Sequence, residues 1–111
     1  MKQKIALLTI AVVLIFCAFP QESKAEGFTS AEFLKWPKNK QDSYMSISIG
    51  MTAFIASQTD VHKKKASCID NWYYSDKAKK NTFIRSVMQD NSGYHPQAII
   101  LGVIEKQCGE F

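Results

Sequence analysis

The sequence predicts an all-α fold, a small bundle of four to five helices that one disulfide cross-links near the C-terminus. Three observations support this prediction. Apolar residues recur at a period near 3.6 along most of the chain, and period-2 alternation is confined to residues 46–50. Capping patterns and two internal prolines divide the chain into helix-length segments. Two cysteines, Cys68 and Cys108, remain once the N-terminal segment is set aside.

Residues 1–25 have the pattern of a secretory signal peptide. A positively charged start precedes an apolar, uncharged run over residues 5–19, and small residues occupy the positions that signal peptidase reads before Glu26. The run is shorter than the roughly 18 to 20 residues of a membrane-spanning helix. We therefore expect export, cleavage after Ala25 and a periplasmic location, with the membrane contacted only through this segment if it is uncleaved. A lipoprotein modified at Cys17 is the weaker alternative, because the preceding Phe16 is large.

Cleavage leaves residues 26–111, which we expect to form a single helical domain. Eleven basic and nine acidic residues remain, a formal net charge of +2 rather than the +4 of the whole chain, so charge does not argue for nucleic-acid binding. A domain of this size buries only about 60 to 65% of its unfolded surface and is marginally stable without a cross-link. An even cysteine pair in an exported domain predicts a Cys68–Cys108 disulfide, worth about 4 kcal/mol in chain entropy.

The first two helices are expected at residues 29–36 and at about residues 40–57. Thr29 and Glu32 form a capping-box pattern, and Pro37 ends the first helix. In the second helix, large apolar residues at spacings of 3, 4, 3 and 1 form a single stripe, which we expect to face the core. The stripe consists of Tyr44, Ile47, Met51, Phe54 and Ile55.

The polar segment over residues 58–67 is expected to be an exposed loop or a frayed helix end. Its run of three lysines is more typical of a solvated surface than of a lipid or acidic-partner site. Cys68, Ile69 and Trp72 then predict the inward edge of a short helix, whose end Tyr73 and Tyr74 cover.

The next helix is expected from Asp76 to Asp90, capped by Ser75 or Asp76. Its predicted apolar face consists of Ala78, Phe83, Ile84, Val87 and Met88. The sequence Asn91-Ser92-Gly93 predicts the turn that follows.

The last helix is expected to begin after His95, with Pro96 at its first position, where the missing N–H costs nothing. The broad apolar surface of residues 99–104 fits either a central core helix or the seam of a homodimer. Cys108 lies on the same face, and Gly109 suits the left-handed position past the helix end.

The sequence contains no recognisable set of catalytic, metal-binding or cofactor-binding residues. His62 and His95 are the only histidines, and no nucleophile pairs with His62 in sequence. The cysteine spacing is not that of a redox or metal site, and there is no glycine-rich phosphate loop or nucleophile elbow. We therefore expect a binding protein, not an enzyme, with no cofactor and no metal.

Taken together, these motifs resemble the Rap/Tai family of type VI secretion immunity proteins. The resemblance is carried by "FLKW" in the first helix, "YMSISIGMTAFIA" starting at Tyr44, Cys68-Ile69, His95-Pro96 and Cys108 near the end. It implies a small, exported, helical protein, often dimeric, that binds a peptidoglycan amidase effector in the periplasm. Inhibition would follow from occlusion of the amidase active site, without chemistry by the immunity protein itself.

The expected contact site for this partner is the exposed polar segment, chosen for its polarity and exposure. It comprises Gln58, Asp60, His62, Lys63, Lys64 and Lys65. Specificity in such a pair would come from a few well-packed anchors and from charge matching.

Two other interpretations remain open. A periplasmic acid-stress chaperone of the HdeA kind shares the small size, helices, single disulfide and export, and "TSAEFLKW" is similar to the first helix of that family. That family has a cysteine in its first helix, whereas this chain has none between Glu26 and Cys68. The third interpretation is an exported helical interaction domain of unknown partner.

Overall fold

The computed structural model describes residues 27–111, so the predicted signal segment lies outside the described residues. The elements are α2 (Ser30–Phe33), α3 (Lys38–Ser57), the 3-10 turn η1 (Asp60–His62), α4 (Lys63–Ser75), α5 (Lys77–Asp90) and α6 (Pro96–Cys108). Over residues 27–111 there are five α-helices and no strand, which confirms the predicted all-α fold.

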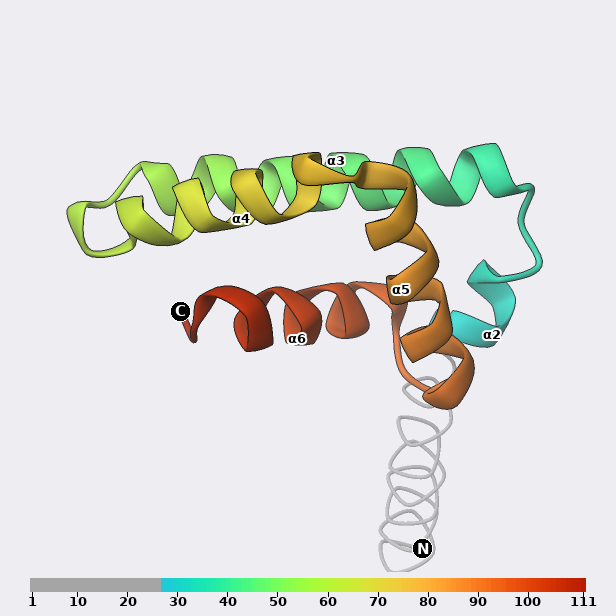
Figure 1. Cartoon of the computed structure of the whole chain (residues 1–111). Coiled ribbons are helices and arrows are strands. Elements are labelled where there is room, and N and C mark those ends of the chain that lie inside the picture. Colours follow the sequence, from blue (N-terminus) through green and yellow to red (C-terminus); the bar gives the residue numbers. More distant parts are fainter. Residues whose placement is uncertain (1–26) are drawn as a thin grey trace, which may run out of the picture.

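The largest feature of the fold is a helical hairpin, in which α3 and α4 run side by side in opposite directions (Figure 1). Helix α5 turns away from the end of α4, and α6 then runs back along the hairpin, antiparallel to α4. The short α2 packs at the far end of α5, where the backbone amide of Ser30 donates to the carbonyl of Tyr94 at 2.7 Å. This arrangement encloses the core between the hairpin, α5 and α6.

The core is made almost entirely of aliphatic side chains with two aromatic rings. It comprises Phe33, Met45, Ile49, Ala53, Ile69, Tyr73, Ile84, Met88, Ile99, Ile100, Val103 and Ile104. Helix α6 contributes four of these residues, so a central core position accounts for most of its apolar breadth. Tyr73 was expected to cover a helix end and is instead fully buried.

The predicted core stripe of α3 is correct only for Tyr44, which is half-buried against the core, because the rest of the helix presents its other face to the core. The side chains of Ile47, Met51, Phe54 and Ile55 are 67%, 54%, 60% and 63% exposed. The buried face consists of Gln41, Met45, Ile49, Ala53 and Ala56. The helix has apolar residues on both faces, so the helical periodicity of the apolar residues could not indicate which face is buried. The small alanines on the buried face leave room for the close approach of α4.

Helix α2 also differs from the prediction, since it ends at Phe33 rather than at Trp36. Residues 34–36 form a turn that the buried side chain of Gln41 stabilises. Its Nε2 donates to the carbonyl of Leu34 at 3.1 Å and to that of Trp36 at 2.9 Å. Hydrogen bonds from another helix therefore replace the expected last turn of α2.

Residues 58–67, predicted to be an exposed loop or a frayed helix end, are mostly exposed as predicted, and most of them are helical. Only Gln58 and Thr59 lack helical structure; residues 60–62 form η1, and residues 63–67 belong to α4. The predicted apolar face of α5 is correct for Ile84 and Met88, which are buried, and for the half-buried Val87. It is wrong for the exposed residues 78 and 83.

The predicted helix-end signals are confirmed. The side chains of Thr29, Asp76 and His95 each accept a hydrogen bond from a backbone amide in the first turn of the helix that follows, at 3.2, 3.2 and 3.0 Å. Pro96 occupies the first turn of α6. Gly109 follows α6 with a φ of 94°, a conformation that glycine adopts without strain.

The predicted disulfide is confirmed and joins α4 to the end of α6. The Sγ atoms of Cys68 and Cys108 are 1.98 Å apart, and the two cysteines are 40 positions apart in the chain. Such a cross-link is compatible with an oxidising, exported location. Within residues 27–111, no helix combines the length and hydropathy that crossing a bilayer requires.

Candidate functional site

The hairpin tip, defined as residues 58–65, lies at one end of the molecule, where α3 turns into α4 (Figure 1). Helix α3 ends because the amides of Gln58 and Thr59 turn back to carbonyls of its last turn, at 3.1 and 3.4 Å. The η1 turn then leads directly into α4. The tip is therefore a short convex connection supported on both sides by long helices.

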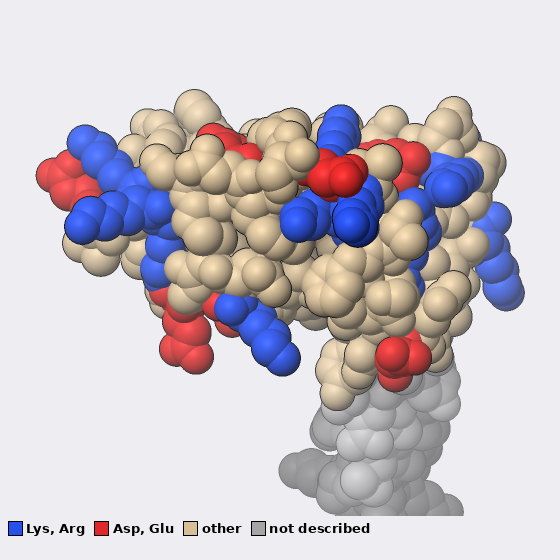
Figure 2. All heavy atoms as spheres, in the orientation of Figure 1, with Lys and Arg blue, Asp and Glu red and all other residues tan. Residues whose placement is uncertain are grey.

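Four of the six predicted contact residues point into solvent at this tip. Gln58, Asp60, Lys63 and Lys64 are exposed, and Asp60 forms an ion pair with Lys63 at 2.9 Å. Because both partners are well exposed, the pair contributes little to stability. Figure 2 shows basic and acidic side chains next to one another at this end of the molecule. These charges are available to a partner.

Val61 is a contact candidate that sequence reasoning missed. Its side chain is 84% exposed between charged neighbours at the centre of the tip. The available signal was a single apolar residue inside an otherwise polar segment. An exposed aliphatic side chain offers apolar area whose burial by a partner would favour binding.

The other two predicted residues turn toward the C-terminus instead of outward. The half-buried ring of His62 lies 5.8 Å from the ring of Phe111, and the Nζ of Lys65 lies 5.1 Å from the centre of that ring. The Nδ1 of His62 is buried without a hydrogen-bond partner among residues 27–111. These two side chains hold the C-terminus against the base of the tip.

A second surface is the apolar α3 face, defined as Ile47, Met51, Phe54 and Ile55. Residues 43–59 contain no charged side chain. Beside this face lies a hollow of about 430 Å³. It is lined by Thr52, Ile55, Ala56, Thr59, His62, Leu101, Glu105 and Phe111. The surface is therefore apolar and continuous from α3 to α6 and the C-terminus.

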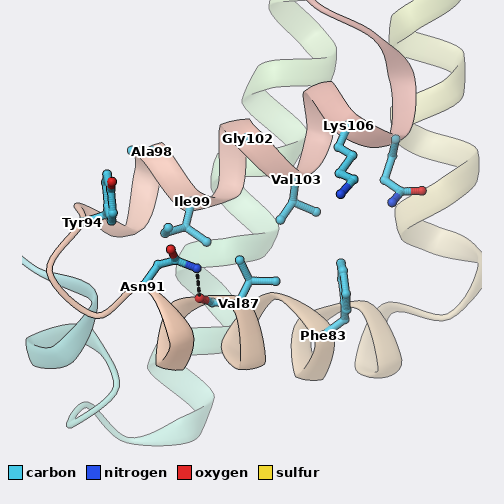
Figure 3. A pocket seen from close by; sticks show the side chains of 10 residues that line it. Phe83, Val87, Asn91, Tyr94, Ala98, Ile99, Gly102, Val103 and Lys106 are labelled. Atoms are coloured by element: carbon cyan, nitrogen blue, oxygen red, sulfur yellow. Dashed lines mark hydrogen bonds between the residues drawn. The ribbon is translucent and has the colours of Figure 1, made fainter.

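A third surface is an apolar groove of about 450 Å³ between α5 and α6 (Figure 3). Phe83 and Val87 of α5 face Ile99 and Val103 of α6 across it, and Lys106 is the charged residue among its lining. Asn91 closes one end of the groove with its Nδ2 donating to a backbone carbonyl of α5 at 2.9 Å. The groove can receive an apolar side chain.

The main buried polar network connects α3, α4 and α5. The carboxylate of Asp42 accepts a hydrogen bond from Arg85 at 2.6 Å and one from the side-chain amide of Asn81 at 3.3 Å. The side-chain oxygen of Asn81 in turn accepts a hydrogen bond from the hydroxyl of Tyr73 at 2.7 Å. Burial raises the pKa of Tyr73, although hydrogen bonds to its hydroxyl oppose the rise. Burial likewise raises the pKa of Tyr44. The network's groups satisfy one another, which fits a structural role.

Within the described part of the chain, no three His, Cys, Asp or Glu side chains come together as metal ligands would. The hairpin tip is convex and charged around Val61, the α3 face is apolar, and the α5–α6 groove is concave and apolar. Surfaces of these kinds are suited to protein binding. No family model, curated protein or solved structure matches this chain.

Proposed function

We propose that this protein is an immunity-type binding protein that inhibits a peptidoglycan amidase effector of a type VI secretion system. It would act in the periplasm, after export and removal of residues 1–25, by occluding the effector's active site. The observation that supports this proposal best is the hairpin tip, where Val61 is 84% exposed between Asp60 and Lys63. The resemblance of the sequence motifs to Rap/Tai proteins supplies the class of partner.

The tip has the physical properties that an inhibitor of a cleft-shaped active site requires. It is convex, and α3 and α4 hold its backbone on both sides. The Cys68–Cys108 disulfide lies within one turn of its α4 end, and Phe111 packs against its base. A segment ordered before binding loses little conformational entropy on binding, which favours affinity.

The contribution expected from each group follows from its chemistry. Burial of the Val61 side chain in the amidase cleft would add about 1.5–3 kcal/mol, the range for an aliphatic side chain moved out of water. Lys63 and Lys64 would accelerate association with an amidase whose cleft has an acidic rim. They would disfavour partners whose rim is basic. None of these side chains needs to take part in a reaction.

The test is titration of the exported, oxidised protein against a peptidoglycan amidase effector, which the proposal expects to be encoded beside its gene. Binding is read by calorimetry and inhibition by release of peptide from purified peptidoglycan. We expect inhibition at one-to-one stoichiometry at neutral pH. Val61→Asp should weaken binding by about tenfold or more, because it places a carboxylate in an apolar contact. Ala78→Asp, an exposed change on α5, is the matched control and should bind normally. Absence of inhibition by the unmodified protein would exclude the proposal.

The exposed apolar surfaces of α3 and of the α5–α6 groove favour one second candidate, an acid-stress chaperone of the HdeA kind. A chaperone should suppress aggregation of several unrelated unfolded proteins at about pH 2–3, below the usual carboxylate range. An immunity protein should instead bind a single folded enzyme at neutral pH, so the two assays separate the candidates.

A further inference from the structure

The groove between α5 and α6 combines two apolar walls with one charged end. Phe83 and Val87 line the α5 wall, and Ile99 and Val103 line the α6 wall. At one end, the side chain of Lys106 extends from α6 toward α5 (Figure 3). This lysine forms no salt bridge with any residue of the described range 27–111. The groove therefore offers a ligand both apolar area and a cation that is free to pair with an anion.

We propose that this groove binds one fatty acid, with the hydrocarbon chain between the two walls and the carboxylate beside the Nζ of Lys106. The volume of about 450 Å³ lies within the range of small-molecule sites. From Phe83 to Asn91 the α5 wall is about 12 Å long, at about 1.5 Å per helical residue. A recess that runs along two helices in this way suits an extended, unbranched chain.

The walls can be covered by a hydrocarbon without leaving a polar group unsatisfied. The side-chain amide of Asn91 already donates to the carbonyl of Val87 at 2.9 Å. None of the residues that line the groove has a buried side-chain nitrogen or oxygen without a hydrogen-bond partner. Burial of the chain therefore gains apolar contact without the cost of stripping water from an unpaired polar atom.

The α6 side of the groove is open to close approach. Ala98 and Gly102 both line it and are exposed. A Cβ atom added at Gly102 would meet no atom within 4 Å. A ligand chain can therefore lie close to the backbone of α6, and a larger side chain at position 102 would take its place.

The charge at the end of the groove selects the head group of the ligand. The hollow beside α3 has a similar volume, about 430 Å³, but Glu105 lines it and no lysine or arginine does. A carboxylate is attracted to Lys106 and repelled by Glu105, so a fatty acid should occupy the groove and leave the hollow empty. The inference uses no residue of the hairpin tip and does not depend on the proposed inhibition of an amidase.

The test is calorimetric titration of the exported, oxidised protein with dodecanoate at neutral pH, below the concentration at which dodecanoate forms micelles. We expect one site with a dissociation constant on the order of 0.1 mM. Octanoate should bind at least about tenfold more weakly, because a shorter chain buries fewer methylene groups. In NMR spectra, dodecanoate should shift the amide signals of Gly102 and Val103 and leave that of Ile55, beside the hollow, unchanged.

Two variants test the position of the chain and of the head group. Gly102→Trp should abolish binding by filling the groove, whereas Ala78→Trp, an exposed change on α5 outside the groove, should bind normally. Lys106→Glu should reverse the preference for dodecanoate over dodecyltrimethylammonium, which has the same chain and the opposite charge. Lys38→Glu makes the same change of charge away from the groove and should keep the preference. Circular dichroism verifies that all four variants are folded.

Three results would overturn the inference. They are an absence of dodecanoate binding, binding that Gly102→Trp leaves intact, and a head-group preference that Lys106→Glu does not reverse. Cosedimentation with phosphatidylglycerol vesicles that Gly102→Trp abolishes would assign the groove to bilayer lipid and would also overturn it.

Discussion

Truncation of two isoleucines on the same helix gives the sharpest test of how α3 is oriented. Ile49 is fully buried in the core, whereas Ile47, two residues earlier, is 67% exposed. The two side chains are chemically identical and lie in the middle of α3, so helix propensity changes equally when either becomes alanine. Any difference between Ile47→Ala and Ile49→Ala therefore reports burial.

The expected magnitudes differ by several kcal/mol. Ile49 packs within the cluster formed by α3, α4 and α6, and its truncation removes buried methyl groups and leaves a cavity. Such changes lower the free energy of unfolding by 2–5 kcal/mol, and a fully enclosed site should lie near about 3–4 kcal/mol. Ile47 loses little burial in the monomer, so Ile47→Ala should change that free energy by less than about 0.5 kcal/mol.

The measurement is urea unfolding of the exported, oxidised protein, followed by circular dichroism. Equal urea dependence (m value) in all three proteins would show that the same surface is exposed on unfolding. If Ile47→Ala costs as much as Ile49→Ala or more, α3 presents the face that its large apolar stripe predicts, and the described packing is refuted.

Three further predictions concern the disulfide, a buried tyrosine and the N-terminus. The double variant Cys68→Ser, Cys108→Ser should lose about 4 kcal/mol of unfolding free energy, measured by urea unfolding; an unchanged midpoint would show that the loop contributes nothing. Because burial raises the pKa of Tyr73, its neutral form stabilises the fold fully below the unfolded value of 10.0, and this contribution is lost as pH rises through the higher folded pKa. Relative to Tyr73→Phe, the unmodified protein should therefore lose stability between about pH 9 and 12, and parallel curves would contradict the assignment. N-terminal sequencing of the exported protein should begin at Glu26, and a sequence beginning at Met1 would show that the signal segment is retained.

The features that the sequence predicted correctly are local or follow from simple counting. The caps at Thr29 and Asp76 each depend on one side chain and the backbone of the next turn. The disulfide followed because only Cys68 and Cys108 remain after residue 25. Such features need no knowledge of how the helices pack, which is why the helix boundaries were largely right.

The candidate site was only partly predictable for a related reason. Polarity identified the hairpin tip as exposed, which holds for four of the six named residues. The inward positions of His62 and Lys65 depend on Phe111, which lies far away in sequence and is brought there by α6 and the disulfide. Val61 was overlooked because the exposure of an apolar residue is a property of the folded chain.

By itself, the sequence determined the helical class, most of the helix ends and the single cross-link of this protein. Only the tertiary structure decided which face of α3 is buried, and with it the surface left for a partner. Both faces carry apolar residues at helical period, so the choice depends on the summed packing of α4 and α6. The face with Ala53 and Ala56 admits a close neighbour and is buried, whereas Met51 and the other large side chains stay outside.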